Sequence, residues 1–412
     1  MSVQDILRRA KNAAPVLARS SEPSKNQALA AIADELEKRA SEVLAANEID
    51  MKNSEGKLPT GMLDRLKLNE SRIAGLAKAM REVIELADPT GKVIEEKTLA
   101  NGLHLQKISV PIGVIGCIYE ARPNVTIDIA ALAIKSGNAA ALRGGSAAEN
   151  TNRILVEIIQ SGLTKAGLPA DSVQTIDPFG REGATAMMQA RGLVDVLIPR
   201  GSASLIHAVV NESKVPVIET GDGVVHIYVD SEVDQTIVAP IVVNSKAQRP
   251  SVCNSLETLL IHEAVTEKLL PEIGRALSEA GVTIHGCEKT QQIISCTPAT
   301  EEDWSTEYLS LDLSVKVVRD FDEALAHIAK YSTHHTESIL TKIQANADRF
   351  LSEIDSAVVM VNSSTRFTDG GEFGFGAEVG ISTQKLHARG PMGLRELTST
   401  KWLVRGSGQV RS

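Results

Sequence analysis

The sequence is poor in aromatic residues and contains no long hydrophobic run. Aromatic residues make up 3% of its 412 residues, so any core must be built from alanine, valine, isoleucine and leucine. No stretch approaches the roughly 18–20 apolar residues that span a bilayer, and the first residues lack the features of a signal peptide. These absences argue against a membrane protein and predict a cytoplasmic one.

Basic stretches and metal-binding cysteine spacings are also missing. The net charge is −9, with no lysine- and arginine-rich stripe of the kind that neutralises phosphate backbones, so nucleic acid is a poor candidate partner. The cysteines are not spaced as metal ligands, and without an export signal they are expected to be reduced thiols. There are four: Cys117, Cys253, Cys287 and Cys296. We therefore expect no metal site.

What the chain does contain is 412 residues, a length typical of two or three domains, and a hydrophobic fraction of 43%, which is enough for a sizeable core. Helical spacing of apolar residues predicts amphipathic helices over 26–46 and 66–84. Residues 93–110 alternate around Asn101-Gly102, which is the strongest short-range signal for a β-hairpin.

Strands and helices alternate along the rest of the chain. Between residues 110 and 229, apolar runs typical of buried parallel strands are separated by helical stretches, which predicts a doubly wound α/β domain. The predicted strands are 110–118, 139–143, 173–176, 194–198, 215–218 and 226–229. A second such series from 230 to 361 predicts a second α/β domain, and the glycine-rich segment 363–393 predicts ordered loops.

Cys253 is the strongest candidate for a reactive side chain. It lies in a polar turn before the predicted strand 256–262, close in sequence to Lys246 and Arg249, whose charges would favour the thiolate. A buried structural cysteine is an equally weighted alternative. Cys117 lies inside an apolar strand and is expected to be a core residue, and Cys287 and Cys296 are expected to be structural.

Several polar residues follow predicted strands, where open α/β sheets bind ligands. The amide of Asn124 is placed to stabilise an oxyanion, although a helix cap or turn would also explain it. Two glycine turns are candidate phosphate contacts, with tight-turn packing as the alternative. They are Arg143-Gly144-Gly145-Ser146 and Arg200-Gly201-Ser202. Glu219, after the strand 215–218, is a candidate base or ligand-orienting group, or a solvated loop residue.

Six segments, taken in order, resemble the aldehyde dehydrogenase superfamily and, within it, the γ-glutamyl phosphate reductases. They are 110–128, 136–152, 199–206, 215–230, 244–262 and 377–397, and the last two are specific to the reductases. The resemblance implies an α/β fold with a Rossmann-type cofactor domain, a second α/β catalytic domain and a β-hairpin oligomerisation element. The implied bounds are 1–92 and 110–228 with part of 362–385 for the cofactor domain, 229–361 for the catalytic domain, and 93–109 with 386–412 for the oligomerisation element.

The resemblance also implies roles for the candidate residues. Cys253 would be the nucleophile, and Asn124 with the Cys253 backbone N–H would form the oxyanion hole. The cofactor would be NADP(H), because Ser146 falls where NAD-preferring relatives place a glutamate, and Arg143 beside it suits a 2′-phosphate. The implied cofactor-binding set is Arg143, Gly144, Gly145, Ser146, Gly201, Ser202 and Glu219.

Substrate binding requires cations, because the implied substrate carries a carboxylate and an acyl phosphate. Arg122 and Arg249 flank the two catalytic turns and are the first candidates, while His387 and Arg389 are weaker ones. A salt bridge with a structural carboxylate is the alternative for each arginine. Glu307 is a candidate for the glutamate that holds the nicotinamide ribose in relatives. Glu219 is the base in hydrolytic relatives, but a reductase has no need of a deacylating water.

The implied reaction is the NADPH-dependent reduction of L-glutamyl 5-phosphate to L-glutamate 5-semialdehyde and phosphate through a cysteinyl thioester, the second step of proline biosynthesis from glutamate. Two alternatives are another acylating or hydrolytic aldehyde dehydrogenase and a non-catalytic nucleotide-binding protein. The expected partners are a small-molecule substrate, further copies of the chain in a dimer or larger oligomer, and, transiently, glutamate 5-kinase.

Overall fold

The computed structural model describes residues 1–58 and 60–411 of the chain, which divide into two compact units. The first unit contains Met1–Glu219, Gly374–Gly380 and Met392–Ser412, and the second contains Thr220–Phe373 and Ile381–Pro391. The glycine-rich segment near the C-terminus therefore passes from one unit to the other, instead of belonging to a single domain as a continuous segment.

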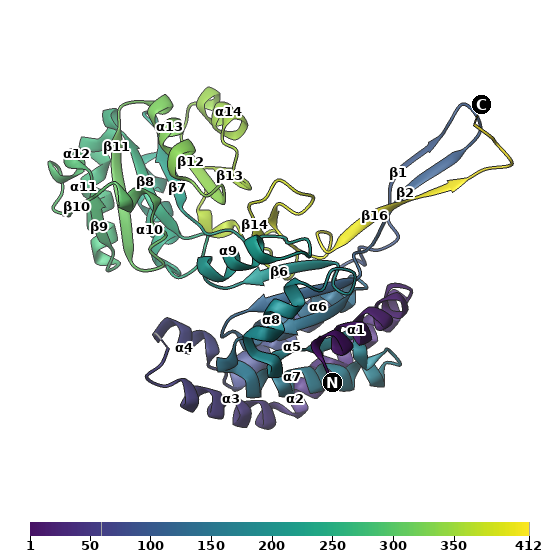
Figure 1. Cartoon of the computed structure of the whole chain (residues 1–412). Helices are drawn as coiled ribbons and strands as arrows, with labels where there is room; N and C mark the ends of the chain where they lie inside the picture. The colour runs from purple at the N-terminus through teal and green to yellow at the C-terminus, as the bar shows by residue number, and fades with distance from the viewer. Residues whose placement is uncertain (59, 412) are drawn as a thin grey trace. The chain divides into compact units, whose positions relative to one another are not determined.

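The first unit begins with five helices before its first strand: α1 Val3–Ala18, α2 Glu22–Lys38, α3 Ala40–Ser54, α4 Thr60–Leu66 and α5 Glu70–Glu85 (Figure 1). The hydroxyl of Ser2 and the carboxylate of Asp5 form a capping box that starts α1, which the sequence pattern had not predicted. The single helix predicted over 26–46 is wrong, because the backbone leaves helical geometry at Arg39 (φ −100°, ψ 19°). This break lets the buried faces of α2 and α3 pack separately against α7, Glu149–Lys165.

A four-stranded parallel sheet forms the centre of the first unit, in the order β5-β4-β3-β6. Its strands are β3 Val114–Tyr119, β4 Ala139–Arg143, β5 Val173–Thr175 and β6 Val196–Arg200. The helices that connect and follow them are α6 Pro123–Lys135, α7, α8 Gly180–Met188 and α9 Ala203–Glu212. All six residues of β3 are buried, as a strand covered on both faces requires. The strand predicted over 215–218 is reduced to one bridge, between Leu197 and Val217.

An antiparallel ribbon of three strands completes the first unit, in the order β1-β2-β16. The strands are β1 Val93–Thr98, β2 His104–Pro111 and β16 Thr398–Arg405, and Figure 1 shows β16 lying along β2 over its whole length. Gly102 sits in the connecting turn with φ +85°, a left-handed conformation that glycine adopts without strain. The predicted hairpin is confirmed.

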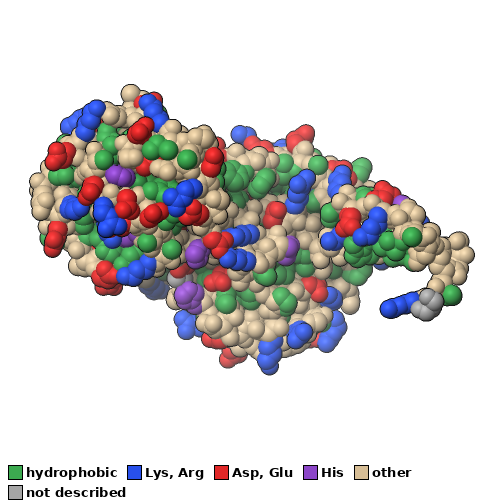
Figure 2. All heavy atoms as spheres, turned by 90° about the horizontal axis from the view of Figure 1, so that it is seen from above, with side chains coloured by type: hydrophobic (Ala, Val, Ile, Leu, Met, Phe, Trp, Pro, Cys, Tyr) green, Lys and Arg blue, Asp and Glu red, His purple; other side chains and the backbone are tan. Residues whose placement is uncertain are grey.

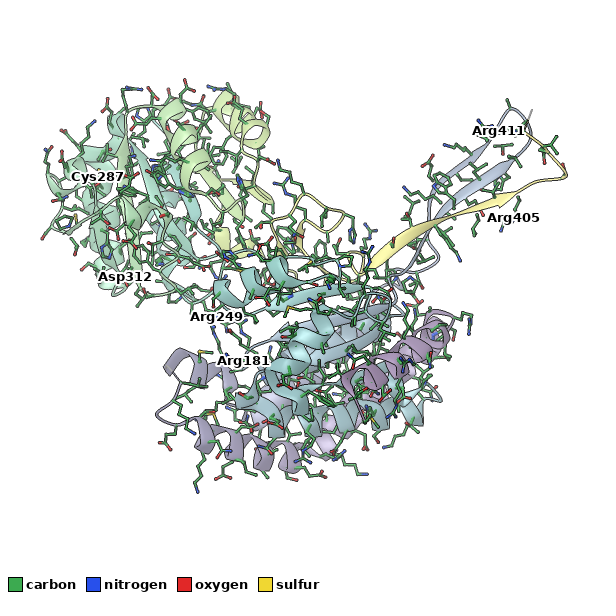
Figure 3. All side chains as sticks on the ribbon, viewed as in Figure 1. Arg181, Arg249, Cys287, Asp312, Arg405 and Arg411 are labelled. Carbon is green, nitrogen blue, oxygen red and sulfur yellow. The ribbon has the colours of Figure 1, made fainter. Side chains whose placement is uncertain are left out.

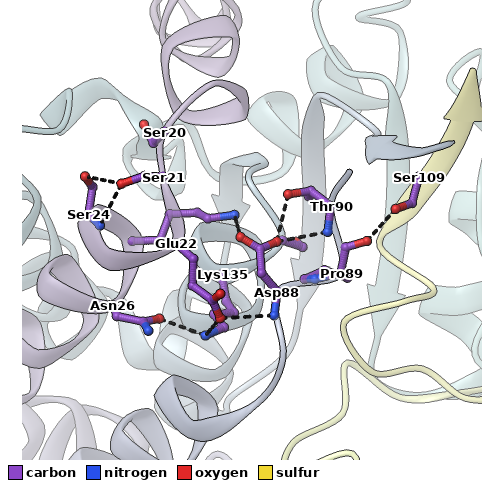
Figure 4. Close-up of polar contacts among 12 residues, drawn as sticks. Ser20, Ser21, Glu22, Ser24, Asn26, Asp88, Pro89, Thr90, Ser109 and Lys135 are labelled. Carbon is purple, nitrogen blue, oxygen red and sulfur yellow. Dashed lines mark hydrogen bonds and ion pairs between the residues drawn. The ribbon is translucent and has the colours of Figure 1, made fainter. Parts of the chain in front are cut away.

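A buried polar network joins the helices of the first unit near the ribbon (Figure 4). The Lys135 ammonium group, at the end of α6, is fully buried and donates to Glu22 (3.2 Å), Asn26 (2.7 Å) and the carbonyl of Ile84 (2.9 Å). The backbone N–H of Asp88 bonds the same carboxylate of Glu22 at 3.2 Å. Because a buried ammonium group is costly without several acceptors, this network fixes α2, α5 and α6 in one arrangement.

The second unit is built on a seven-stranded parallel sheet with the order β10-β9-β11-β8-β7-β12-β13. The strands are β7 Val225–Val229, β8 Leu256–His262, β9 Thr283–Gly286, β10 Thr297–Pro298, β11 Asp312–Val318, β12 Thr336–Leu340 and β13 Val358–Val361. The sequence placed β7 at the end of the first domain, which is wrong: β7 pairs with β8 and β12 in this sheet.

Helices and loops of the second unit complete its core. The helices are α10 Gln235–Ala247, α11 Glu263–Glu279, α12 Glu288–Gln291, α13 Phe321–Tyr331 and α14 Gln344–Glu353. Short strands β14 Ile381–Ser382 and β15 Gly390–Pro391 pair with each other.

Among the described residues no helix is both long enough and apolar enough to cross a membrane. Acidic and basic side chains are interspersed over the face drawn in Figure 2.

Candidate active site

Cys253 lies in a short irregular turn between the end of α10 and the start of β8. Its side chain is part-buried, whereas Cys117 on β3 is fully buried and its thiol pKa is raised to about 12 by burial. The alternative of a fully buried structural cysteine therefore holds for Cys117 and not for Cys253. A thiol at the rim of a strand end is accessible to a substrate.

The residues after Cys253 are held by a loop more than a hundred positions later in the chain. Asn254 is buried, and its side-chain amide donates to the carbonyl of Thr368 at 2.7 Å. The hydroxyl of Thr365 donates to the carbonyl of Asn254 at 2.8 Å. These bonds restrain the backbone on the C-terminal side of Cys253, as positioning a nucleophile requires.

Gly223 packs directly against the backbone of Cys253. A Cβ atom added at Gly223 would lie 1.5 Å from the carbonyl oxygen of Cys253, so any larger residue would displace the turn. The N–H of Gly223 donates to the carboxylate of Glu307 at 2.8 Å. Glu307 thus fixes the segment that packs against Cys253, which is a contact that the sequence did not predict.

Lys246 does not take the place that its nearness in sequence to Cys253 suggested. Its side chain is fully buried on α10 and pairs with the fully buried carboxylate of Glu257 on β8 at 2.6 Å. Burial raises the pKa of Glu257 to about 8 and lowers the pKa of Lys246, and the attraction between the two partners opposes both shifts. Lys246 is therefore held in a buried ion pair with Glu257, and its role as an activating cation stays a prediction.

Arg366 is a cation near Cys253 that sequence reasoning missed. It lies in the 3₁₀ turn Thr365–Phe367, is part-buried, and donates from Nε to the side-chain oxygen of Gln248 at 2.7 Å. Burial lowers the pKa of Arg366, the charge of Asp369 opposes that shift, Arg249 lowers the pKa further, and Cys253 raises it. Arg366 therefore interacts electrostatically with Arg249, which is labelled in Figure 3, and with Cys253, the candidate nucleophile.

A small cavity of about 210 Å³ adjoins this arginine. Its lining residues come from the end of α10 and from the segment after β13: Asn244, Gln248, Arg366, Phe367, Asp369 and Glu372. Arg249 is exposed one residue beyond Gln248. Arg249 and Arg366 repel each other, and two such like charges are typical of a site that binds an anion, because a ligand of opposite charge offsets their repulsion.

Asn124 is the second residue of α6 in the first unit. Arg122 is the residue that precedes the helix and makes no side-chain capping bond, so the alternative that Asn124 caps the helix is wrong. The amide nitrogen of Asn124 instead donates to the carboxylate of Asp128, one turn later, at 3.0 Å. Arg122 and Asn124 are both part-buried.

The turn after β4 carries most of the candidate cofactor contacts. Arg143 is part-buried and donates from Nε to the carbonyl of Gly180 at 3.2 Å, and Ser146 is exposed. The N–H of Gly144 donates to Asp177 at 2.6 Å, and a Cβ there would lie 2.0 Å from the amide nitrogen of Asn152. Close packing therefore accounts for glycine at 144, and its N–H is already bonded within the protein.

The turn after β6 is occupied by a carboxylate. Glu120 accepts from the backbone N–H of Ser202 at 2.9 Å and from its hydroxyl at 2.8 Å. Ser202 also caps α9 by accepting from the N–H of Leu205. A Cβ at Gly201 would lie 2.8 Å from the carboxyl carbon of Glu120, so glycine makes room for this contact. The start of α9 thus binds an acidic group, as a helix N-terminus favours.

The remaining candidates fall on both units. Glu219 is part-buried at the end of the first unit, and His387 is exposed in the second. Arg389 donates to the carboxylate and the carbonyl of Asp355, both at 2.9 Å, so the salt-bridge alternative holds for this arginine. Cys287 accepts a bond from the backbone N–H of Val317 at 3.4 Å, consistent with a structural thiol.

The comparisons with known proteins identify the family. Residues 1–310 match the model of the aldehyde dehydrogenase family. The chain is 60% identical to a γ-glutamyl phosphate reductase of Leifsonia xyli over 100% of the chain and 98% of that protein. It is 56% identical to one from Thermobifida fusca, over 99% of the chain and 98% of that protein.

Solved structures agree with this result. The crystal structure of γ-glutamyl phosphate reductase from Thermotoga maritima has a TM-score of 0.97 and 47% identity, and each chain is covered completely. An acetylating aldehyde dehydrogenase from Geobacillus thermoglucosidasius, at 17% identity and a TM-score of 0.73, shares the fold. This chain therefore belongs to the aldehyde dehydrogenase family. Within that family its place is among the γ-glutamyl phosphate reductases, and the predicted family and α/β fold are confirmed.

Proposed function

We propose that this chain reduces L-glutamyl 5-phosphate to L-glutamate 5-semialdehyde and phosphate, with NADPH as the hydride donor and Cys253 as the nucleophile. The chain is then an oxidoreductase that catalyses the second step of proline biosynthesis from glutamate. The observation that carries the proposal is identity of 53–60% with γ-glutamyl phosphate reductases over at least 96% of the chain.

In the proposed reaction the thiolate of Cys253 attacks the acyl carbon of the substrate, phosphate leaves, and the acyl group stays on sulfur as a thioester. Asn124 and the backbone N–H of Cys253 donate to the oxygen that becomes negative during attack. Cys253 belongs to the second unit and Asn124 to the first.

Arg249 and Arg366 are the proposed cations for the substrate's anionic groups. Arg366 interacts electrostatically with Cys253, and Arg249 precedes Cys253 in the same turn of the sequence. Each could therefore bind an anionic group of a ligand whose acyl carbon reaches the sulfur. Planar guanidinium groups bind phosphate and carboxylate through paired hydrogen bonds, which also fixes the ligand's orientation. Arg122, beside Asn124, is the corresponding candidate in the first unit.

The residues of the first unit fit NADP(H). Arg143 donates from Nε to the neutral carbonyl of Gly180, and its positive charge, which also acts on Asp177, suits a 2′-phosphate. Ser146, exposed beside it, carries no charge that would repel that phosphate. We propose that Arg143, Gly145, Ser146 and the turn Gly201-Ser202 contact the cofactor, which supplies hydride when bound, and that Gly144 shapes the turn.

Two glutamates receive different roles in this proposal. Glu307 supports the nucleophile through Gly223, as its 2.8 Å hydrogen bond indicates. Glu219 remains a candidate cofactor contact. It is not proposed as a base, because reduction of the thioester, unlike its hydrolysis, requires no activated water.

The test runs the reaction backwards with L-glutamate 5-semialdehyde, NADP and phosphate, following the absorbance of NADPH. Cys253→Ser should abolish phosphate-dependent NADP reduction, while Cys287→Ser, a matched change in the same unit, should retain it. Asn124→Ala should slow turnover by ~10²–10³-fold, since one oxyanion donor contributes about 3–4 kcal/mol. NADP reduction that depends on coenzyme A or proceeds with water alone would support the alternative acylating or hydrolytic enzyme.

A non-catalytic role is tested by thiol labelling. If Cys253 reacts no faster than Cys287 in the same protein, and NADPH does not change that rate, the result supports the non-catalytic nucleotide-binding alternative.

We also propose that the ribbon β1-β2-β16 is an oligomerisation element, in a dimer or larger assembly. Cross-linking through Arg405→Cys, on the exposed β16, tests that assignment. A transient contact with glutamate 5-kinase, which makes the labile substrate, completes the proposed partners.

A further inference from the structure

Asp128 stands one helical turn after Asn124 on α6 and bonds its amide. The distance from Nδ2 of Asn124 to Oδ2 of Asp128 is 3.0 Å, and both side chains are part-buried. Residues four apart lie on the same face of a helix, so α6 alone sets this contact. Of the charged groups, Arg200 at the end of β6 acts on the Asp128 carboxylate.

A carboxylate next to an amide decides which way the amide points. The oxygen and nitrogen ends of an asparagine side chain have nearly the same shape, so packing alone distinguishes them poorly. An ionised carboxylate can only accept hydrogen bonds, and it therefore requires the NH₂ end to face it. The amide carries two N–H hydrogens, so the bond to Asp128 uses one and leaves the second to donate elsewhere.

We propose that Asp128 is a positioning residue that holds Asn124 with its NH₂ end toward the oxygen of the reacting acyl group. This inference rests on the proposed function, because it deepens the role of Asn124 as the oxyanion donor. In the reverse orientation Asn124 would present its carbonyl oxygen to a developing negative charge, which is repulsive. Asp128 itself touches neither the substrate nor the cofactor in this proposal.

The protonation state of Asp128 changes what it enforces. Burial raises its pKa to about 6, while the bond from Asn124 and the charge of Arg200 oppose that shift. Once protonated, the carboxyl group donates a hydrogen bond, and the oxygen end of Asn124 becomes the better partner for it. Catalysis should therefore weaken as the pH falls through this range, for a reason separate from ionisation of the thiol.

The experiment compares wild type with Asp128→Ala, Asp128→Asn, Asn124→Ala and the double variant Asp128→Ala/Asn124→Ala in the full-length enzyme. Rates of phosphate-dependent NADP reduction are measured from about pH 5 to pH 9. Asp171→Asn is the control, since Asp171 also accepts from a side-chain amide in the same unit, that of Gln174 at 3.1 Å, besides its surface ion pair with Arg9. Each variant's rate is divided by that of wild type at the same pH, which cancels the titration of Cys253 and of the substrate.

We expect Asp128→Ala to lower kcat by ~10–100-fold with little change in KM. The hydrogen bond from Asn124 to the oxyanion forms in the transition state, so misorienting Asn124 affects the rate of reaction and not substrate binding. Asp128→Asn can accept from Asn124 or donate to it, so its kcat should fall less, and its rate relative to wild type should rise as the pH falls below about 6. The double variant should be no slower than Asn124→Ala, because the two residues act as one unit. The ratio for Asp171→Asn should be flat and close to one.

Three results would overturn the inference: a double variant slower than Asn124→Ala by the full effect of Asp128→Ala, a pH-independent ratio for Asp128→Asn, or wild-type kcat in Asp128→Ala. Failure of the proposed function is distinguishable, because then the wild type itself would show no phosphate-dependent NADP reduction; a wild-type rate in Asn124→Ala would refute the role of Asn124 as the oxyanion donor. Circular dichroism and the NADPH dissociation constant report whether α6 and its unit remain folded. A variant that loses both activity and fold is replaced by Asp128→Glu. This variant retains a carboxylate, so its activity should again fall at low pH as that of the wild type does.

Discussion

Replacing Gly223 by alanine tests how tightly Cys253, the proposed nucleophile, is held. The added Cβ would lie 1.5 Å from the carbonyl oxygen of Cys253, and separations under 3.0 Å essentially never occur for real Cβ atoms. The two backbone segments must therefore separate by about 1.5 Å, and the neighbour is backbone, which cannot rotate away as a side chain can. Gly223 has no positive φ, so the effect of the substitution comes from this contact alone.

A displacement of ~1 Å at a reacting group can lower a rate about 10²-fold, so we expect Gly223→Ala to lose at least that factor in kcat/KM. NADPH binding should be nearly unchanged, because the candidate cofactor residues belong to the other unit. The assay is phosphate-dependent NADP reduction, together with the alkylation rate of Cys253 and the thermal unfolding midpoint. Gly75→Ala in α5, where an added Cβ meets nothing within 4 Å, is the control and should behave as wild type.

The result that would refute the reasoning is a folded Gly223→Ala enzyme with kcat/KM within about threefold of wild type. Such activity would mean that the Cys253 turn is mobile, or that its position matters little to the chemistry. Glu307→Gln offers an independent comparison, since it weakens the hydrogen bond to Gly223 without adding an atom. It should lower kcat/KM by less than Gly223→Ala does.

The structure supports three further predictions. Lys246→Met should destabilise the enzyme by ~3–5 kcal/mol in denaturant unfolding, because it leaves the buried Glu257 unpaired, and Lys246→Met/Glu257→Leu should recover most of that loss. Glu120→Gln should tighten NADPH binding by ~3–10-fold in fluorescence titration, because the carboxylate now at the start of α9 would compete with a cofactor phosphate; unchanged affinity would place the phosphate elsewhere. Burial lowers the pKa of His327 to about 2, so the folded state stays neutral where the unfolded state takes up a proton. Stability should be full above the unfolded pKa of about 6.5 and fall by ~1.4 kcal/mol per pH unit below it, and His327→Gln should lose this slope.

The local sequence predicted most of the elements that surround the site. The strands 139–143 and 256–262 occur with the predicted bounds, because burial on both faces leaves a short run of mainly apolar residues. The Asn101-Gly102 hairpin was equally clear, since its turn requires a backbone that few residues adopt. The family, and with it the candidate nucleophile, followed from segments in which neighbouring residues together form one turn.

Only the tertiary structure decided which distant segments meet. The apolar residues of 225–229 predict a buried strand in any sheet. They do not indicate which strands lie beside it, which in the structure are β8 and β12. Lys246 lies seven residues before Cys253 but turns toward Glu257, because the helix directs its side chain into the core. Arg366 reaches Gln248 from 118 positions away, a separation across which no local pattern carries information. Periodicity records the burial of each element, whereas side-chain partners depend on how the elements pack.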